Sequence, residues 1–351
     1  MKDIFKVVFV IIGTLIGAGF ASGQEIYLFF FSYGIKGLIG IIVSSILMGI
    51  TIYKTLVIVD KFEVKNYKEY LELFIKPKKE EEYFNLKNII NLVINIFILI
   101  TFFIMIAGFG AYFGQEIGIS NIIGSIILAT LSFIVLITSV KGVIKVNEIL
   151  VPILIIFVIS IGILNLKNIP ILQLDKYIVR TNNSNYILSA ILYCSYNSIL
   201  LIPVLITLRD YIKNKKQIGI ISILTAIITI ILSVMIFLIL AKVDVDITKL
   251  EMPAVYVVSN MFKYLRVVYG FIILGSIFTT AVSLGNSFIQ NISKDSKSYP
   301  QVALIMCITS VVVSQIGFSN LINFLYPIFG YLGLIQILVN ILKKTSKTDI
   351  T

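Results

Sequence analysis

The chain has 351 residues, of which 58% are hydrophobic and 13% are charged, and its mean hydropathy is +1.01. This composition excludes an ordinary soluble domain and indicates a polytopic helical membrane protein. The formal net charge of +11 does not indicate a nucleic-acid partner, because no basic patch is interleaved with stacking aromatic residues. Histidine is absent and both cysteines lie in apolar runs, which argues against a zinc site or a disulfide framework.

Apolar segments follow one another along the whole chain and predict an all-α fold of about ten transmembrane helices. In order, the segments cover residues 4–31, 35–59, 86–113, 121–140, 146–166, 186–208, 217–241, 267–292, 300–316 and 320–342. Placing the N-terminus inside puts most of the 29 basic residues on the cytoplasmic side. The positive-inside rule therefore predicts a multi-pass protein of the cell membrane with both termini in the cytoplasm.

The two halves of the chain resemble each other in their pattern of segments. Five segments precede residue 185 and five follow it. An odd number of spans per half makes the second half enter the membrane from the opposite side, which is the arrangement of an inverted repeat. We expect one transmembrane domain over 1–351, with repeats of about 1–184 and 185–351.

Each half has one long charged loop between its second and third segments, at residues 60–85 and 242–266. Apolar residues recur at helical spacing in both loops, and the second pattern begins at Pro253. We expect amphipathic helices that lie along the surface, one on each side of the membrane. Solvated connectors without a packed face are the alternative.

The first apolar segment contains a stretch, residues 12–31, that is unlike a simple membrane anchor. Its middle holds Gly13, Gly17, Ala18, Gly19, Ala21, Ser22 and Gly23, followed by Gln24 and Glu25. Glycine costs a helix interior about 1 kcal/mol relative to alanine, and a carboxylate at membrane depth is more costly still. The pattern predicts two half-helices joined by unwound backbone. The alternative is close helix packing, since Gly13/Gly17 and Gly19/Gly23 are small-xxx-small pairs.

The sixth segment, which begins the second half, is polar at its centre over residues 193–198 and is poor in helix formers there. We expect a second break at this point, so that both segments one and six are discontinuous. Interrupted segments at corresponding positions of two halves indicate a transporter binding site at the repeat interface.

Two such breaks would offer complementary groups to a small solute. N–H groups over residues 21–24 suit a substrate carboxylate, whereas carbonyl groups over residues 13–17 suit an ammonium group or a small cation. The residues that we expect to contact substrate are Gly17, Ala18, Gly19, Ala21, Ser22, Gly23, Glu25, Tyr193, Tyr196 and Asn197.

Glu25 is the most informative single residue, because an ionised Glu25 would repel a carboxylate bound at the same N–H groups. It could pair with a substrate amine or take up a proton during transport, and the sequence does not choose between these. A hydrated position near the outer interface is the alternative. The tetrapeptide Gly-Gln-Glu-Ile recurs at 114–117, where we expect Glu116 to serve a helix end.

The eighth segment carries a polar stripe at helical spacing: Ser276, Thr279, Thr280, Ser283, Asn286, Ser287 and Gln290. Hydroxyl groups facing open carbonyl groups make an all-oxygen site for a hard cation such as Na⁺. The alternative is that these side chains bond the backbone of their own helix.

Three motifs resemble those of the YkvI-type membrane proteins, amino acid permeases related to the amino acid–polyamine–cation transporters. These are GTLIGAGFASGQEI at 13–26, SYNS at 195–198 and SLGNS at 283–287. The resemblance spans essentially the whole chain. It implies a LeuT-like fold of five plus five helices, with substrate bound between segments one and six. By position, the resemblance also implies a Na⁺ site. Its ligands would be the carbonyl groups of Gly13 and Ile16 and the side chains of Thr279, Thr280 and Ser283.

The function that we predict is secondary active transport of a small amino-acid-like solute, coupled to Na⁺ or H⁺. The alternative is a nutrient-sensing membrane receptor subunit of the same fold that carries no net flux. The sequence lacks the residue patterns that enzymes commonly use, because it has no histidine, no clustered carboxylate pair and no Gly-x-Ser-x-Gly. Apart from a coupling Na⁺ we expect no cofactor.

Overall fold

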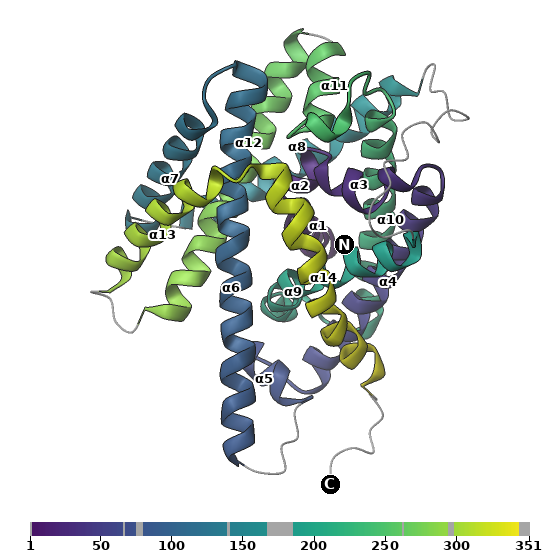
Figure 1. Ribbon diagram of the computed structural model, residues 1–351. Helices are drawn as coiled ribbons and strands as arrows, with labels where there is room; N and C mark the ends of the chain where they lie inside the picture. Colours follow the sequence, from purple (N-terminus) through teal and green to yellow (C-terminus); the bar gives the residue numbers. More distant parts are fainter. Residues whose placement is uncertain are drawn as a thin grey trace.

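A computed structural model describes residues 2–65, 67–74, 80–138, 141–166, 185–261, 263–293 and 298–343, which are helical with short turns and contain no strand (Figure 1). The α-helices are α1 (Lys2–Leu15), α2 (Ala18–Ala21), α3 (Gln24–Phe29), α4 (Lys36–Lys61), α5 (Tyr67–Glu72), α6 (Glu80–Tyr112), α7 (Asn121–Thr138), α8 (Lys141–Asn165), α9 (Tyr186–Thr207), α10 (Lys215–Leu240), α11 (Pro253–Met261), α12 (Lys263–Ile292), α13 (Tyr299–Ser314) and α14 (Phe318–Leu342). Short 3₁₀ turns follow α3, α9 and α10, and a π-helical turn, η2 (Phe113–Ile117), continues α6.

Within the described residues, 7 helices are long and apolar enough to cross a membrane. They correspond to predicted segments two, three, four, six, seven, eight and ten. Segments five and nine appear as shorter apolar helices, at Ile149–Asn165 and Tyr299–Ser314, and segment one is broken. The all-helical, multi-span architecture is thus confirmed, while the ten-span inverted repeat stays a prediction.

Helix α9 lies in the interior, packed between α4 and α14 (Figure 1). The contact with α14 is close because α14 carries Gly330 and Gly333 on the facing side. A methyl group on Gly330 would come within 3.0 Å of Leu192, and one on Gly333 would overlap the backbone of Ser195. Small residues at such crossings let two membrane helices approach closely.

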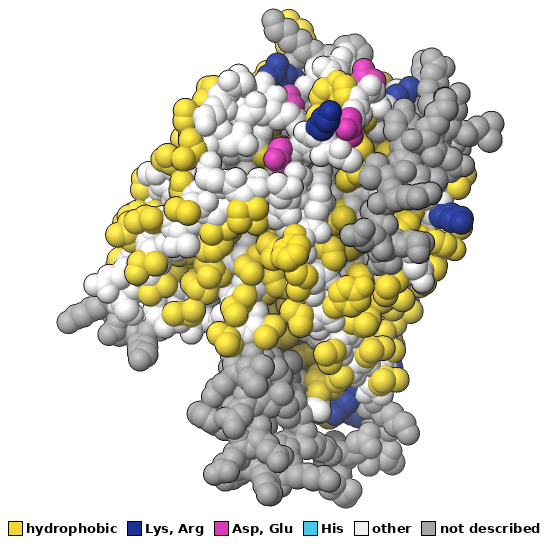
Figure 2. All heavy atoms as spheres, in the orientation of Figure 1, with side chains coloured by type: hydrophobic (Ala, Val, Ile, Leu, Met, Phe, Trp, Pro, Cys, Tyr) yellow, Lys and Arg dark blue, Asp and Glu magenta, His cyan; other side chains and the backbone are white. Residues whose placement is uncertain are grey.

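The outer surface of the bundle is apolar. On α4 the exposed side chains include Ile39, Ile42, Ile46 and Ile50, which recur every three or four residues along one face. Figure 2 shows hydrophobic side chains over the middle of the face in view, with the acidic side chains near its upper end. Such a surface suits contact with lipid.

The two charged loops carry helices α5 and α11, which lie near opposite ends of the bundle (Figure 1). Helix α11 begins at Pro253, as the sequence predicts, and buries Ala254 and Val258. In α5, Tyr70 is buried in a cluster with Ile202 of α9. Both helical predictions are confirmed, although residues 75–79 of the first loop lie outside the described residues.

The prediction of a break in segment six is wrong. Helix α9 runs without interruption from Tyr186 to Thr207 and includes all of residues 193–198. The polar side chains there bond to carbonyl groups one turn earlier in the same helix: Ser195 to Ile191, Asn197 to Tyr193 and Ser198 to Cys194, at 2.7–3.0 Å. These bonds are compatible with the helical hydrogen bonds, so the polar residues do not open the helix.

Candidate substrate site

The break in segment one is confirmed, and it lies between α1 and α2. The Ile16 N–H donates to the Ile12 carbonyl at 2.8 Å, and the pattern resumes only where the Ala21 N–H donates to Gly17 at 3.1 Å. In between, the carbonyl groups of 13–16 and the N–H groups of 17–20 have no backbone partner in the described part of the chain. Open carbonyl groups at these positions agree with the sequence prediction.

The open N–H groups lie earlier in the chain than expected. The sequence analysis placed them at residues 21–24, but the N–H groups of Ala21, Ser22 and Gly23 donate to the carbonyl groups of Gly17, Ala18 and Phe20. The short helix α2 is responsible, because it starts one residue after Gly17, whose backbone is extended (φ −86, ψ −171). The N–H groups of its first turn are therefore the open ones.

The turn between α2 and α3 is covered by α11 and α12. Gly23 has φ +84, a left-handed conformation that glycine adopts without a steric penalty. The Ala254 N–H at the start of α11 donates to the Ser22 carbonyl at 2.8 Å. The hydroxyl of Tyr269 on α12 donates to the Ala21 carbonyl. The two carbonyl groups that end α2 are thus occupied.

Glu25, in the first turn of α3, is turned back toward the break. Its side chain is 3% exposed, which excludes the hydrated alternative for this conformation. One carboxylate oxygen accepts a hydrogen bond from the Tyr196 hydroxyl of α9, and the carboxylate also accepts the Phe20 N–H of α2. A methyl group on Gly19 would overlap this carboxylate. Glu25 therefore already binds one of the open N–H groups of α2, that of Phe20.

Aromatic rings surround the contact between Glu25 and α9. The Tyr196 ring is stacked between Phe29 and Tyr326, with ring centroids 5.5 Å and 4.7 Å away. Tyr193 meets Phe29, Phe30 and Tyr196 edge to face, at centroid distances of 5.5, 4.9 and 5.5 Å. The rings come from α3, α9 and α14, so the broken segment, the sixth segment and the tenth segment meet here.

Two amide side chains lie nearby with different roles. Asn197 donates to the Tyr193 carbonyl of its own helix, and its contact with substrate stays a prediction. Gln24 donates to the Asn323 side chain of α14 at 3.2 Å, while its buried Oε1 has no protein partner. A buried acceptor without a donor costs about 1–3 kcal/mol, which a bound polar group would recover.

The predicted Na⁺ ligands lie on α1 and α12. Ile16 and Thr279 are buried, whereas Gly13, Thr280 and Ser283 are partly exposed. The Thr279 hydroxyl donates to Ser276 at 3.1 Å and the Ser283 hydroxyl donates to Thr279 at 2.8 Å. A donating hydroxyl keeps lone pairs for a cation. Their common site stays a prediction.

The alternative reading of the glycines as packing residues holds for part of the segment. A methyl group on Gly13 would lie 2.7 Å from Val151 of α8, so Gly13 does allow close packing. Gly17, by contrast, has no atom within 4 Å of such a methyl group. Packing and unwinding therefore coexist, with open space beside Gly17.

Glu116 does more than end a helix. It lies in the π-helical turn η2, where its carboxylate accepts the Ser259 hydroxyl of α11 and pairs with Arg266 of α12 at 3.5 Å. Gln115 donates to the Met252 carbonyl at 3.0 Å and accepts the Met252 N–H at 2.9 Å. These bonds hold α11 over the turn between α2 and α3, which sequence reasoning missed because the partners are more than 100 residues away.

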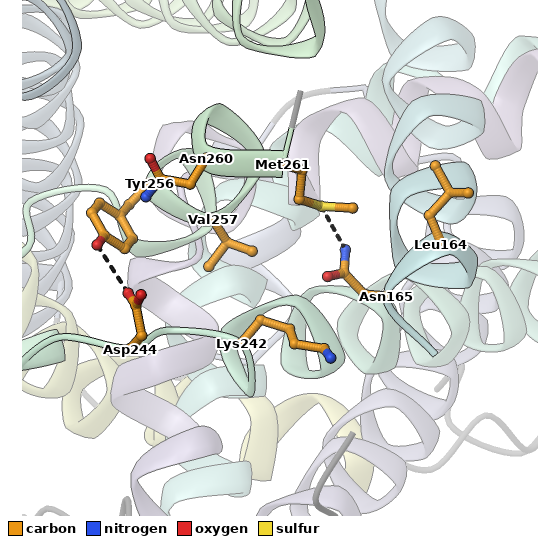
Figure 3. Close-up of a pocket in the computed structure, with 8 residues that line it drawn as sticks. All are labelled: Leu164, Asn165, Lys242, Asp244, Tyr256, Val257, Asn260 and Met261. Atoms are coloured by element: carbon orange, nitrogen blue, oxygen red, sulfur yellow. Dashed lines mark hydrogen bonds between the residues drawn. The ribbon is translucent and has the colours of Figure 1, made fainter. Parts of the chain in front are cut away.

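A separate cavity of about 300 Å³ lies at the α11 end of the bundle and contains none of the predicted site residues (Figure 3). Its walls come from the end of α8, the segment after α10, and α11. The Tyr256 hydroxyl donates to Asp244 at 2.9 Å, and this hydrogen bond raises the pKa of Tyr256. Asn165 donates to the Met261 sulfur at 3.2 Å across the other side. Figure 3 shows these two hydrogen bonds on opposite sides of the cavity.

Tyr326, Phe29 and Asn323 also belong to the surroundings of Glu25, and sequence reasoning missed them. Each lies in an apolar segment among many aromatic or apolar residues, where no local pattern distinguishes it. The Tyr-Pro pair at 326–327 inside segment ten is the single local irregularity that could have drawn attention.

Comparison with known proteins places this chain among membrane proteins. It is 31% identical to the membrane protein YkvI of Bacillus subtilis strain 168 over 363 residues, a match that covers 97% of this chain and 96% of YkvI. The chain belongs to the YkvI family. The resemblance to YkvI-type membrane proteins inferred from the three motifs is thereby confirmed, while the relation to amino acid permeases stays a prediction.

This chain also matches two other proteins. The chain is 25% identical to YyaD of the same organism over 332 residues, covering 94% of this chain and 93% of YyaD. A manganese transporter of Eremococcus coleocola matches with a TM-score of 0.44 and 14% identity, covering 95% of this chain and 69% of that chain. No family model matches.

Proposed function

We propose that this protein is a secondary active transporter of a small amino-acid-like solute, driven by a gradient of Na⁺ or H⁺. The observation that carries the proposal is the opened backbone of the first span, with buried Glu25 folded onto it and α9 packed against it. Backbone without regular hydrogen bonds is tolerated at membrane depth where it faces a cavity or a ligand. An ionisable side chain at that depth usually belongs to a functional site.

The two amphipathic helices support a site that opens to one side at a time. Helix α11 contacts the turn between α2 and α3 through Ala254 and is held by Glu116. At the other end, α5 is tied to α14, where Gln336 donates to the Tyr67 hydroxyl at 2.9 Å. Release of one helix at a time would expose the site alternately to the two sides, which is the requirement for coupled transport.

The coupling ion has two candidates in the chain. Na⁺ would bind the carbonyl groups of Gly13 and Ile16 together with Thr279, Thr280 and Ser283, a set of oxygen ligands that suits a hard cation. A proton would be carried by Glu25, the buried carboxylate at the break. If Na⁺ is the coupling ion, Thr280→Ala raises the Na⁺ concentration for half-maximal uptake several-fold. Uptake that is independent of Na⁺ in the parent protein would rule out the Na⁺ site.

Uptake into proteoliposomes tests the proposal. The purified protein is reconstituted and offered radiolabelled amino acids and amines, with an inward Na⁺ gradient, an inward H⁺ gradient or no gradient. We expect uptake above that of protein-free liposomes, accelerated by one of the two gradients. Binding without flux under every gradient would contradict the proposal and favour a nutrient-sensing receptor of the same fold.

A further inference from the structure

The carboxylate of Glu25 has hydrogen-bond donors but no counter-charge. Its donors are the Tyr196 hydroxyl and the Phe20 N–H, both neutral. In the part of the chain that the structure describes, no lysine or arginine forms an ion pair with Glu25. The other buried carboxylate, Glu116, has such a partner in Arg266. A buried charge is strongly unfavourable unless it is paired, so Glu25 is suited to receive a cation.

The surroundings of Glu25 also favour a cation. The Tyr196 ring, whose hydroxyl donates to Glu25, stacks on Phe29 and Tyr326 and meets Tyr193 edge to face. Aromatic rings attract ammonium groups through their quadrupoles. Sites of this composition recognise organic ammonium ions.

The same surroundings disfavour a carboxylate. The Phe20 N–H of the open first turn of α2 already bonds to Glu25, and so does the Tyr196 hydroxyl. An acid group placed there would face the carboxyl group of Glu25, whose hydrogen bonds already occupy these donors. The open carbonyl groups of 13–16, one turn before α2, are acceptors and suit an N–H donor from a ligand.

We infer that the site selects its solute by an organic ammonium group, for which Glu25 is the counter-ion, and that the solute needs no carboxylate. This inference rests on the proposed transport function and names its substrate class. On binding, the ammonium group takes the place of the Tyr196 hydroxyl at Glu25 and lies against the aromatic rings. Amines that lack the acid group of an amino acid are therefore substrates in their own right.

Each of three ligand series keeps one side-chain type and varies which charged group, the ammonium or the carboxylate, is present. Leucine carries both groups, 3-methylbutylamine carries only the ammonium group, and 4-methylpentanoate carries only the carboxylate. Phenylalanine with phenethylamine and 3-phenylpropanoate, and lysine with cadaverine and 6-hydroxyhexanoate, extend the test to aromatic and basic solutes. Binding to the purified full-length protein is measured by calorimetry at pH 7.

We expect that in at least one series the amine binds within about tenfold of the amino acid or more tightly, while the acid does not bind. Glu25→Gln should weaken amine binding by at least about tenfold. Glu116→Gln is the matched control, because it changes the other buried carboxylate and leaves the aromatic cluster intact. It should keep the ligand order, and thermal unfolding of both variants shows that they remain folded.

Three results would overturn the inference: acid binding as tight as that of the amino acid, amine affinity unchanged in Glu25→Gln, or no amine binding in any series. These results differ from failure of the proposed function. An amine that binds through Glu25 but never crosses the membrane would contradict transport and leave the inference standing. Uptake of the acid alone would support transport and overturn the inference.

Discussion

The first span and α9 open the two halves of the chain, and both looked interrupted in the sequence, yet only the first is broken. The first span contains four glycines between residues 13 and 23, one of them left-handed. The centre of α9 contains none, and its serines and asparagine bond to their own helix. Between these two spans, a dense cluster of glycines accompanies the broken helix, whereas polar side chains alone leave the other helix intact.

The contrast also has a functional side. The broken span supplies open backbone groups and the carboxylate of Glu25, while the intact helix supplies a continuous surface with the Tyr196 hydroxyl at its centre. In the proposed transport cycle, the broken span would move against the intact helix when the solute enters and leaves. Four substitutions test this division of roles, in order of expected effect.

Gly19→Ala should have the largest effect on transport. The added methyl group overlaps the Glu25 carboxylate and displaces that side chain from both the Phe20 N–H and Tyr196. Because the displaced group is the end of a flexible side chain, the fold should survive. We expect a roughly hundredfold loss of amine uptake, since two bonds to a charged group are lost.

The control for Gly19→Ala is Gly219→Ala in α10, where an added methyl group meets no atom within 4 Å. That variant should transport normally and be slightly more stable, as alanine favours a helix over glycine. Normal uptake by Gly19→Ala would contradict the position of Glu25.

Tyr196→Phe should have the next largest effect. It removes the hydroxyl that donates to Glu25 and keeps the ring between Phe29 and Tyr326. A hydrogen bond to a charged group contributes about 1.5–3 kcal/mol, so uptake or affinity should change about tenfold or more. Tyr193→Phe is the control, because it also keeps its ring contacts and leaves the Tyr196–Glu25 hydrogen bond in place. An equal effect of both substitutions would show that the hydroxyl of Tyr196 has no special role.

Gly23→Ala should lower stability more than Gly118→Ala. Both glycines have positive φ, +84 and +78, so each substitution costs about 1–2 kcal/mol in backbone strain. At Gly23 the methyl group would also lie 2.8 Å from Ala254 of α11, whereas at Gly118 it meets nothing within 4 Å. Thermal unfolding in detergent measures the difference. Equal melting temperatures of the two variants would mean that α11 does not cover the turn between α2 and α3.

Ser198→Ala should have the smallest effect. The Ser198 hydroxyl bonds to Cys194 within α9, which is already helical. We expect a stability change below about 0.5 kcal/mol and unchanged uptake, because alanine is itself a good helix former. A large loss of uptake would indicate that α9 opens during transport, as the sequence alone had suggested.

Much of the fold could be predicted from local pattern, and much of the site could not. The length of apolar runs located the long helices, Pro253 marked the start of α11, and the glycines located the break. These signals are local, because they concern helix propensity and membrane thickness. The clearest of these signals were Pro253, which starts a helix, and the glycines of the first span, which accompany its break.

What the sequence could not supply is the direction of side chains across helices. Glu25 bonds to the backbone of Phe20 behind it, and that choice depends on the length of α2. Tyr326 reaches the site because Gly330 and Gly333 let α14 approach α9. The Asn197 side chain bonds to the Tyr193 carbonyl of its own helix and not to the open backbone of the first span. Each outcome depends on tertiary contacts between segments far apart in the chain.

Hydrogen–deuterium exchange tests the central claim most directly, because it compares the two spans in one experiment. Peptides covering residues 12–24 and 191–199 are followed in the full-length protein in lipid nanodiscs, with and without a bound amine. The account predicts faster exchange in 12–24, slowing when the amine binds, and constant protection in 191–199. Equal protection of the two peptides, or no change in 12–24 on binding, would contradict it.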